Sequence, residues 1–183
     1  VVTIGLIGSL LNPNDPAQAI GHVAHTVLGV LYAGAFLPHF IWLRAGTGED
    51  GAAWVLYVLA VAMAGDTAAY FAGRSFGRHR LMPSVSPKKT VEGAIGAFGG
   101  NLLAAAAVKA LLMPSATWTE VLVLALVAGV LAQVGDLCES LLKRAFGAKD
   151  SGWLLPGHGG VLDRADSLVF PVVFVYYYVA LTR

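Results

Sequence analysis

Charged residues are scarce in this sequence. Only 13% of its 183 residues are Asp, Glu, Lys or Arg, against roughly 25% in soluble domains, while 57% are hydrophobic. So few charges cannot cover a packed core with a water-facing surface, which excludes an ordinary soluble domain. The formal net charge of +1 leaves neither a basic surface for nucleic acid nor an acidic tail, so we expect no nucleic-acid partner.

Cysteine is almost absent as well. The single Cys138 excludes a disulfide framework within the chain and a metal site made of several cysteines. The sequence starts at Val1 inside an apolar run, with no methionine, basic flank or clear cleavage site, so a signal peptide is not expected. We interpret residues 1–11 as the end of an upstream helix and the chain as the C-terminal part of a longer protein.

Long apolar runs, in contrast, recur along the chain. Crossing a hydrocarbon core about 30 Å thick takes about 20 mostly apolar residues. Five runs approach or exceed that length: residues 17–43, 52–72, 91–113, 118–142 and 167–182. None shows the period-two alternation of a membrane barrel, and backbone groups in lipid need partners within their own segment. The sequence therefore predicts an all-α, polytopic transmembrane bundle of about five spans, with a kink at Pro38 in the first.

Basic residues are concentrated in two of the connections between these runs. The connection over residues 74–89 has no acid and carries Arg74, Arg78, Arg80, Lys88 and Lys89. The connection over residues 143–166 carries Lys143, Arg144, Lys149 and Arg164. Both connections emerge on one side if every run crosses once, and the positive-inside rule makes that side cytoplasmic.

Five acids lie close to these basic connections: Asp66, Asp136, Glu139, Asp163 and Asp166. Acids in membrane spans are costly and are therefore functional candidates. The spacing of Asp136 and Glu139, repeated by Asp163 and Asp166, places each pair on one helical face. Such carboxylates suit a hard divalent cation, and Mg²⁺ usually takes one or two of them plus substrate phosphates. Snorkelling of single acids is the plainer alternative, but it explains five acids at three helix boundaries less well.

The segment before the third run has the features of an anion site. Pro87 disfavours helix before it, and Thr90 can cap the helix that follows. Lys88 and Lys89 then stand near a helix N-terminus, where free N–H groups and the helix dipole favour anions. The alternative is that the two lysines only anchor the helix under the positive-inside rule, which explains the lysines but not the Ser-Pro and Glu-Gly residues around them.

Glycines mark two further segments. Gly93, Gly96, Gly99 and Gly100 form a small-residue stripe, for which we favour close packing within the protein over dimerisation. The loop over residues 156–160 contains three glycines that permit close backbone approach to a ligand, and its His158 could bind phosphate or move a proton.

Four blocks that contain these residues resemble the phosphatidate cytidylyltransferase (CDP-diacylglycerol synthase) family. They are residues 66–78 (DTAAYFAGRSFGR), 86–93 (SPKKTVEG), 135–140 (GDLCES) and a long block over 140–166 that ends in LPGHGGVLDRAD. The resemblance is strong over roughly residues 60–180 and generic over the first 50. Ala165 departs from the family pattern, in which we expect a bulkier aliphatic residue.

The resemblance implies an inner-membrane enzyme, often dimeric, with its active site on the cytoplasmic face. It would join CTP to phosphatidic acid and release pyrophosphate, with Mg²⁺ required and a second cation such as K⁺ as a further candidate. The chain would be a single integral-membrane catalytic domain, with less specific helices over residues 1–60 and the catalytic core over residues 61–183.

The resemblance also implies roles for individual residues. The metal ligands would be Asp136, Asp163 and Asp166, with Asp66 and Glu139 near. The catalytic set would be Asp136, Asp163, Asp166, Lys89 and Arg164. The substrate-binding set would be Ser86, Lys88, Lys89, Thr90, Tyr70, Arg74, Lys143, Arg144, His158, Gly159 and Gly160.

Two other functions stay open. A CTP-dependent lipid kinase, such as a polyprenol kinase, would transfer the γ-phosphate instead. An ion-coupled or proton-coupled transporter would place its acids near the bilayer midplane, whereas these cluster at one face. A CDP-alcohol phosphotransferase is disfavoured because Asp166 is followed by Ser167, so the run D-x-x-D-G-x-x-A-R is absent.

Overall fold

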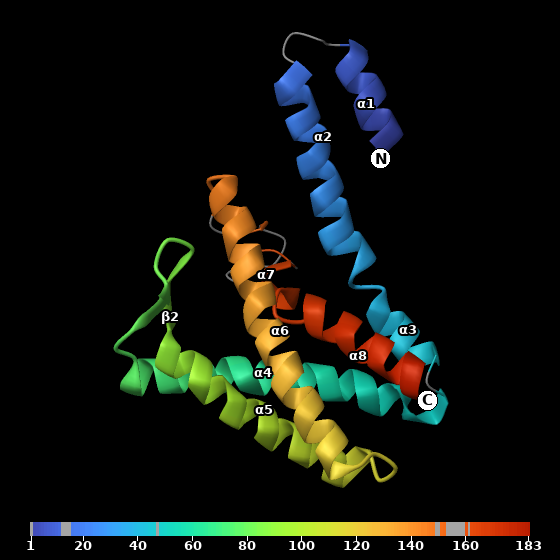
Figure 1. Ribbon diagram of the computed structural model, residues 1–183, viewed down its shortest axis with the longest axis vertical. Helices are drawn as coiled ribbons and strands as arrows, with labels where there is room; N and C mark the ends of the chain where they lie inside the picture. The colour runs from blue at the N-terminus through green and yellow to red at the C-terminus, as the bar shows by residue number, and fades with distance from the viewer. Residues whose placement is uncertain (1, 12–15, 47, 149–150, 153–159, 161) are drawn as a thin grey trace. The chain divides into compact units, whose positions relative to one another are not determined.

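The computed structural model of this chain is mainly helical (Figure 1). It describes residues 2–11, 16–46, 48–148, 151–152, 160 and 162–183. The chain divides into two compact units, Val1–Pro38 and His39–Arg183. Each unit is considered separately below.

The smaller unit is a helical hairpin. Helix α1 (Val2–Leu11) packs against α2 (Pro16–Val30), which continues into a π-helical turn, η1 (Leu31–Ala35). The next helix, α3 (His39–Gly46), belongs to the larger unit and starts directly after Pro38. Proline lacks an N–H and its ring clashes with the preceding turn, which interrupts the helix as predicted for this position. The apolar run over residues 17–43 therefore contains helical segments on both sides of Pro38.

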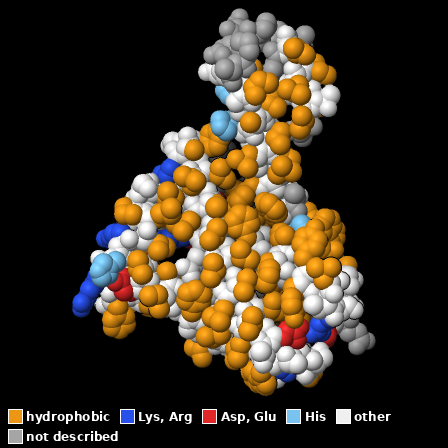
Figure 2. Space-filling model, in the orientation of Figure 1, with side chains coloured by type: hydrophobic (Ala, Val, Ile, Leu, Met, Phe, Trp, Pro, Cys, Tyr) orange, Lys and Arg blue, Asp and Glu red, His pale blue; other side chains and the backbone are white. Residues whose placement is uncertain are grey.

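The larger unit contains the membrane helices. A short 3-10 turn, η2 (Gly48–Asp50), leads into α4 (Gly51–Phe76), which is followed by α5 (Val91–Leu112) and α6 (Trp118–Ala145). These helices have 26, 22 and 28 residues and are long and apolar enough to cross a membrane. Figure 2 shows the matching surface: this face of the unit is largely apolar, with charged side chains gathered toward its edges. The predicted membrane helical bundle is thus confirmed.

Shorter apolar helices accompany the three long ones. Among the described residues, α4, α5 and α6 are the helices whose own length and composition suffice to cross a membrane. The final helix, α8 (Val169–Thr182), has 14 residues and follows the single turn α7 (Leu162–Ala165). One face of α8 packs into the core beside α6, where Val172, Val175 and Val179 are fully buried.

An antiparallel strand pair, β1 (Arg80–Met82) and β2 (Ser86–Thr90), connects α4 to α5. The all-α prediction omitted this hairpin because its residues include Pro87 and two lysines, which are not typical of strands. Thr90 ends the hairpin and starts α5, since its Oγ1 accepts a hydrogen bond from the Gly93 N–H at 3.1 Å. The predicted helix cap at Thr90 is confirmed.

Helices α4 and α5 pack closely against each other, and their ribbons run together at the end next to the hairpin (Figure 1). A Cβ atom at Gly96 would overlap the Ala72 methyl group, and one at Gly100 would overlap the Ala64 carbonyl oxygen. A Cβ at Gly93 would lie 2.8 Å from the Ala69 carbonyl oxygen. The glycine stripe therefore serves packing within the protein, as we favoured. Gly99 is the exception, because its side faces open space.

A buried amide lies where α4, α5 and α6 meet. Asn101 is 1% exposed, and its nitrogen donates to the carbonyls of Ala97 at 3.1 Å and Val61 at 3.0 Å in the orientation that satisfies both groups. It lies against Gly65 of α4 and Gly129 of α6, where any Cβ would overlap it. A polar group away from water is stable only with such partners, so Asn101 fixes how the three helices face one another.

Gly100→Ala should lower the apparent melting temperature of the detergent-solubilised protein by several degrees. The added methyl group meets the backbone of α4, and overpacking of this kind costs about 1–3 kcal/mol. Gly99→Ala is the matched control, because it adds the same methyl group one residue away into open space. Equal melting temperatures for the two variants would contradict the close approach of α4 and α5.

Candidate active site

One end of the larger unit is hollowed into a pocket with a volume of about 620 Å³. Four segments meet there: the C-terminal half of α4, the hairpin with the start of α5, the C-terminal half of α6, and the residues around α7. Nine residues predicted for the site line this pocket: Asp66, Tyr70, Arg74, Lys88, Lys89, Thr90, Asp136, Asp163 and Asp166. Acids and bases that are far apart in sequence thus share one cavity, as predicted.

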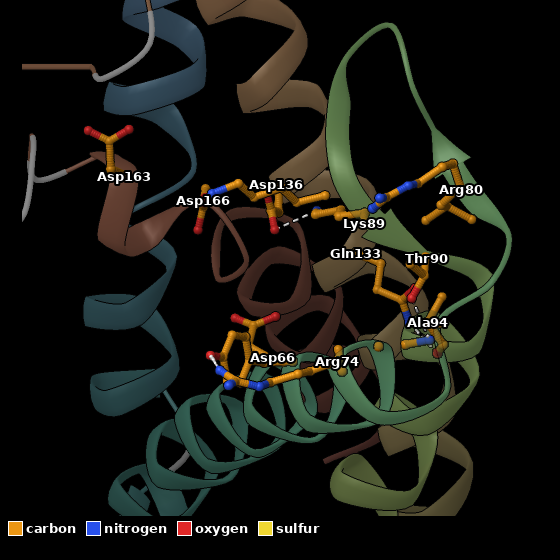
Figure 3. Close-up of a pocket in the computed structure, with 17 residues that line it drawn as sticks. Asp66, Arg74, Arg80, Lys89, Thr90, Ala94, Gln133, Asp136, Asp163 and Asp166 are labelled. Atoms are coloured by element: carbon orange, nitrogen blue, oxygen red, sulfur yellow. Dashed lines mark hydrogen bonds and ion pairs between the residues drawn. The ribbon is translucent and has the colours of Figure 1, made fainter.

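Three carboxylates face a common space in this pocket. Figure 3 shows Asp66 extending from α4 toward Asp136 of α6 and Asp166, which follows α7. The side chain of Ser167 is hydrogen-bonded to Asp66, and the Ser167 N–H donates to Asp166 Oδ1 at 2.7 Å. Like charges are therefore held near one another at the end of an apolar bundle.

The pKa of Asp166 reflects this crowding. Burial raises it first, and the neighbouring carboxylates of Asp136, Glu139 and Asp66 raise it further, against the opposing effect of the Ser167 N–H. The result is a pKa of about 7, against an ordinary value of 3.8. Negative charge at Asp166 is therefore incompletely compensated by the protein.

An ion pair connects the hairpin to α6. Lys89 Nζ of β2 lies 2.5 Å from Asp136 Oδ2 (Figure 3). The two side chains are 25% and 27% exposed, so the pair lies at the pocket wall with access to solvent. A phosphate oxygen could replace the carboxylate as the partner of Lys89 without leaving either charge buried alone.

A second ion-paired cluster lies behind this pocket. Lys143 Nζ is 2.5 Å from Glu139 Oε2 and 2.7 Å from Asp163 Oδ1. Glu139 is 1% exposed, and among the described residues neither of its oxygens has a partner with hydrogen-bond geometry. Asp136 and Glu139 were predicted to share one face of the helix. Asp136 lines the pocket, whereas Glu139 is buried beside Lys143.

Asp163 lines the pocket, but its carboxylate points away from the other three in Figure 3. Its Oδ2 accepts hydrogen bonds from Ser151 N at 2.8 Å, Ser151 Oγ at 2.7 Å and Gly160 N at 2.7 Å. Burial alone would raise the pKa of Asp163, but Lys143 and these donors hold that pKa well below its usual range. Asp163 is thus a permanent anion that joins Ser151 to Gly160.

These donors can be compared with the needs of a metal ion. Among the described residues, no three His, Cys, Asp or Glu side chains are gathered closely enough to hold an ion by themselves. Mg²⁺, however, prefers oxygen donors and often takes one or two carboxylates together with substrate phosphates. The uncompensated charge near Asp166 is of the sign that a cation would neutralise. The donor set therefore fits Mg²⁺ shared with phosphate, and not a cage made of protein alone.

The remaining predicted residues lie outside the pocket lining. Lys143 and Glu139 form the second cluster, Gly160 binds Asp163, and Arg164 is exposed on α7. Arg144 donates to the carbonyl oxygens of Ala148 and Val85, so it supports two backbone segments. Ser86 begins β2 without lining the pocket. His158 and Gly159, and the basic Lys149, lie outside the described residues.

Three residues of the site were missed as functional candidates. Arg80 and Gln133 line the pocket, and Gln133 Nε2 donates to the Ala94 carbonyl at 3.2 Å, which joins α6 to α5. Ser151 holds Asp163. A polar residue in the apolar run of α6 could have indicated Gln133, and the basic connection contained Arg80. Nothing local distinguished Ser151 from other loop serines.

The fold and the site define an integral membrane protein with a phosphate-compatible polar pocket at one end of a helical bundle. The chain belongs to the cytidylyltransferase family, whose sequence profile matches residues 1–182.

Several curated relatives carry the name phosphatidate cytidylyltransferase. The protein of Bacillus subtilis (strain 168) is 38% identical over 159 residues, which are 87% of this chain and 59% of that protein. The protein of Brucella suis is 44% identical over 153 residues, or 84% of this chain and 56% of the relative. The protein of Thermotoga maritima is 38% identical over 180 residues, which are 94% of this chain and 66% of that protein. The chain thus spans somewhat more than half the length of the relatives that it matches.

Asp163→Ala should loosen the backbone at both of its attachment points. The amides of Ser151 and Gly160 should exchange hydrogen roughly tenfold faster or more, since a hydrogen bond to a charged group contributes about 1.5–3 kcal/mol. Hydrogen-exchange mass spectrometry measures this directly. Asp50→Asn is a control at the opposite end of the bundle, where Asp50 pairs with Arg183. Unchanged exchange in Asp163→Ala would contradict the role of Asp163 as an anchor.

Proposed function

We propose that this chain is the catalytic part of a phosphatidate cytidylyltransferase. It would transfer the cytidylyl group of CTP to phosphatidic acid, giving CDP-diacylglycerol and pyrophosphate. The observation that carries the proposal is the pocket in which Lys88, Lys89 and Arg74 stand beside Asp66, Asp136 and Asp166 at one end of an apolar bundle. The names of the relatives support the same activity.

The chemistry needs little proton transfer. An oxygen of the phosphatidic acid phosphate bonds to the α-phosphorus of CTP, and the bond from that phosphorus to the bridging oxygen of the β-phosphate breaks. The attacking oxygen is already anionic, so no strong base is required. The main barrier is repulsion between two polyanions, which fixed cations at a low-dielectric boundary reduce.

The residues of the pocket would divide this work. Lys89 would exchange Asp136 for a phosphate oxygen, and Lys88 and Arg74 would hold other phosphate oxygens. Arg74 Nη1 donates a hydrogen bond to the Tyr70 hydroxyl at 3.0 Å, so Tyr70 would orient the Arg74 guanidinium. The Thr90 cap and the N-terminus of α5 would add backbone dipoles to the same side of the pocket. The second cluster, with Lys143 and Asp163, would support the segment that carries Asp166.

Mg²⁺ belongs to this proposal, and when bound it would supply charge neutralisation for the phosphates. Asp136 and Asp166, with Asp66 near, would hold it together with phosphate oxygens. Asp163, predicted as a third ligand, and Glu139, predicted to lie near the metal, already pair with Lys143. A second cation such as K⁺ stays part of the proposal without an assigned site.

The location follows from the two substrates. The acyl chains of phosphatidic acid stay in the bilayer, while its phosphate reaches the rim of the bundle, where CTP arrives from water. The basic residues of the hairpin and of the end of α6 favour a cytoplasmic position for that rim under the positive-inside rule. The proposed membrane is the inner membrane, as the family resemblance implies. We also propose a homodimer, because the family resemblance implies one.

The purified full-length protein that contains this chain, given CTP, phosphatidic acid and Mg²⁺, should produce a lipid that carries cytidine. CTP labelled in the cytosine ring and CTP labelled in the γ-phosphate separate the possible reactions. Label from the base in the lipid product would support the cytidylyltransferase. Label from the γ-phosphate alone would instead establish a lipid kinase, and no labelled lipid with either substrate would reject both enzymes.

Asp166→Asn should separate metal binding from folding. The substitution removes one of several crowded negative charges, so without Mg²⁺ the variant should melt no lower than the wild type. Mg²⁺ should raise the melting temperature of the wild type by mass action and should raise that of the variant much less. Asp50→Asn is the control, because it also removes one carboxylate but lies outside the pocket lining. Equal Mg²⁺ stabilisation of all three proteins would remove Asp166 from the metal site.

A further inference from the structure

An arginine that has no assigned role lines the pocket. Arg80 lies on β1, in the hairpin that also carries Lys88 and Lys89. In Figure 3 its side chain extends from the strand toward Lys89, on the side of Lys89 away from Asp136. Within the described part of the chain, no ion pair joins Arg80 to an acid. Its charge is therefore available to a ligand in the pocket.

The strand that carries Arg80 is held in place at two points. Arg80 is paired with Thr90, the residue that caps α5. Directly before the strand, the His79 carbonyl accepts a hydrogen bond from Val91 N at 2.9 Å. The strand is thus attached to the N-terminus of α5.

A single carboxylate strengthens this attachment. Glu92, in the first turn of α5, accepts hydrogen bonds from the backbone N–H groups of Arg78 at 3.0 Å and His79 at 3.2 Å. Its Oε1 also lies 2.7 Å from His79 Nδ1. These contacts fix the two residues before Arg80, so the backbone of Arg80 keeps its position although the side chain is exposed. An arginine on a fixed strand loses less conformational freedom on binding than one on a loose loop.

We propose that Arg80 binds the β- and γ-phosphates of the nucleoside triphosphate, the group that leaves as pyrophosphate. The inference rests on the proposed cytidylyl transfer. The reacting α-phosphate has to lie near the carboxylates and Lys89, and the rest of the polyphosphate then extends along the hairpin toward Arg80. A guanidinium presents parallel N–H groups that match two phosphate oxygens at once. Glu92 acts as the positioning residue for this contact.

Arg80→Ala should raise the KM for CTP and the inhibition constant for inorganic pyrophosphate by roughly tenfold or more, which corresponds to about 1.4 kcal/mol. The KM for phosphatidic acid should stay unchanged, because in-line attack puts the lipid phosphate on the side of the α-phosphorus opposite the leaving pyrophosphate, and therefore away from Arg80. Arg80→Lys should recover part of the loss, since it restores the charge without the planar fork. Glu92→Ala should raise the same two constants with Arg80 still present, and Glu92→Gln, which keeps a hydrogen-bond acceptor, should recover part of that loss.

Arg78→Ala is the matched control. It removes an arginine two residues away that does not line the pocket, and it keeps the backbone N–H that binds Glu92. The inference is overturned if Arg80→Ala leaves both constants unchanged, or if Arg78→Ala changes them equally.

Direct titration of inorganic pyrophosphate into the wild type and Arg80→Ala separates this inference from the proposed function. If the wild type makes no cytidine-bearing lipid, the proposed function fails. Weaker pyrophosphate binding by the variant would still support the phosphate contact at Arg80, and equal binding would reject it.

Discussion

The ion pair between Lys89 and Asp136 links the two halves of the pocket. Charge at the end of an apolar bundle is stable only where it is paired or reaches water, and this pair meets both conditions. It holds the hairpin against α6, which closes one wall of the cavity. The carboxylates of Asp66 and Asp166 line the same cavity as Lys88 and Arg74, so acidic and basic groups both face its interior.

That combination of charges matches the needs of phosphoryl chemistry. A pocket lined only by lysines would bind polyanions without a place for a cation, and one lined only by acids would repel them. Here the pair of Lys89 and Asp136 contains both groups. If a phosphate bound Lys89, the Asp136 carboxylate would be released to bind a metal ion. The Lys143 cluster also joins a lysine to carboxylates, but it is less exposed than the Lys89 pair and is bound to backbone N–H groups through Asp163. The more exposed pair suits ligand exchange, and the less exposed cluster suits support.

Prediction from sequence worked best where local rules decide. The bounds of α4, α5 and α6 lie close to the predicted apolar runs, because the length of an apolar run is a property of the chain itself. The Thr90 cap depends on neighbouring residues, and it was confirmed. The hairpin was missed because strand pairing joins residues that sequence patterns treat as a basic loop. The interruption of the helix at Pro38 was predicted, since proline removes a backbone N–H wherever it stands.

The sequence by itself determined that this is a membrane helical bundle with most of its charges gathered at one end, because hydropathy and charge placement are properties of the sequence. Only the tertiary structure decided which charges meet. Asp136 and Glu139 are one turn apart on α6, yet one faces Lys89 in the pocket and the other is buried beside Lys143. A residue's partner depends on how neighbouring helices cross, and here the glycine faces of α5 and the Asn101 amide fix those crossings.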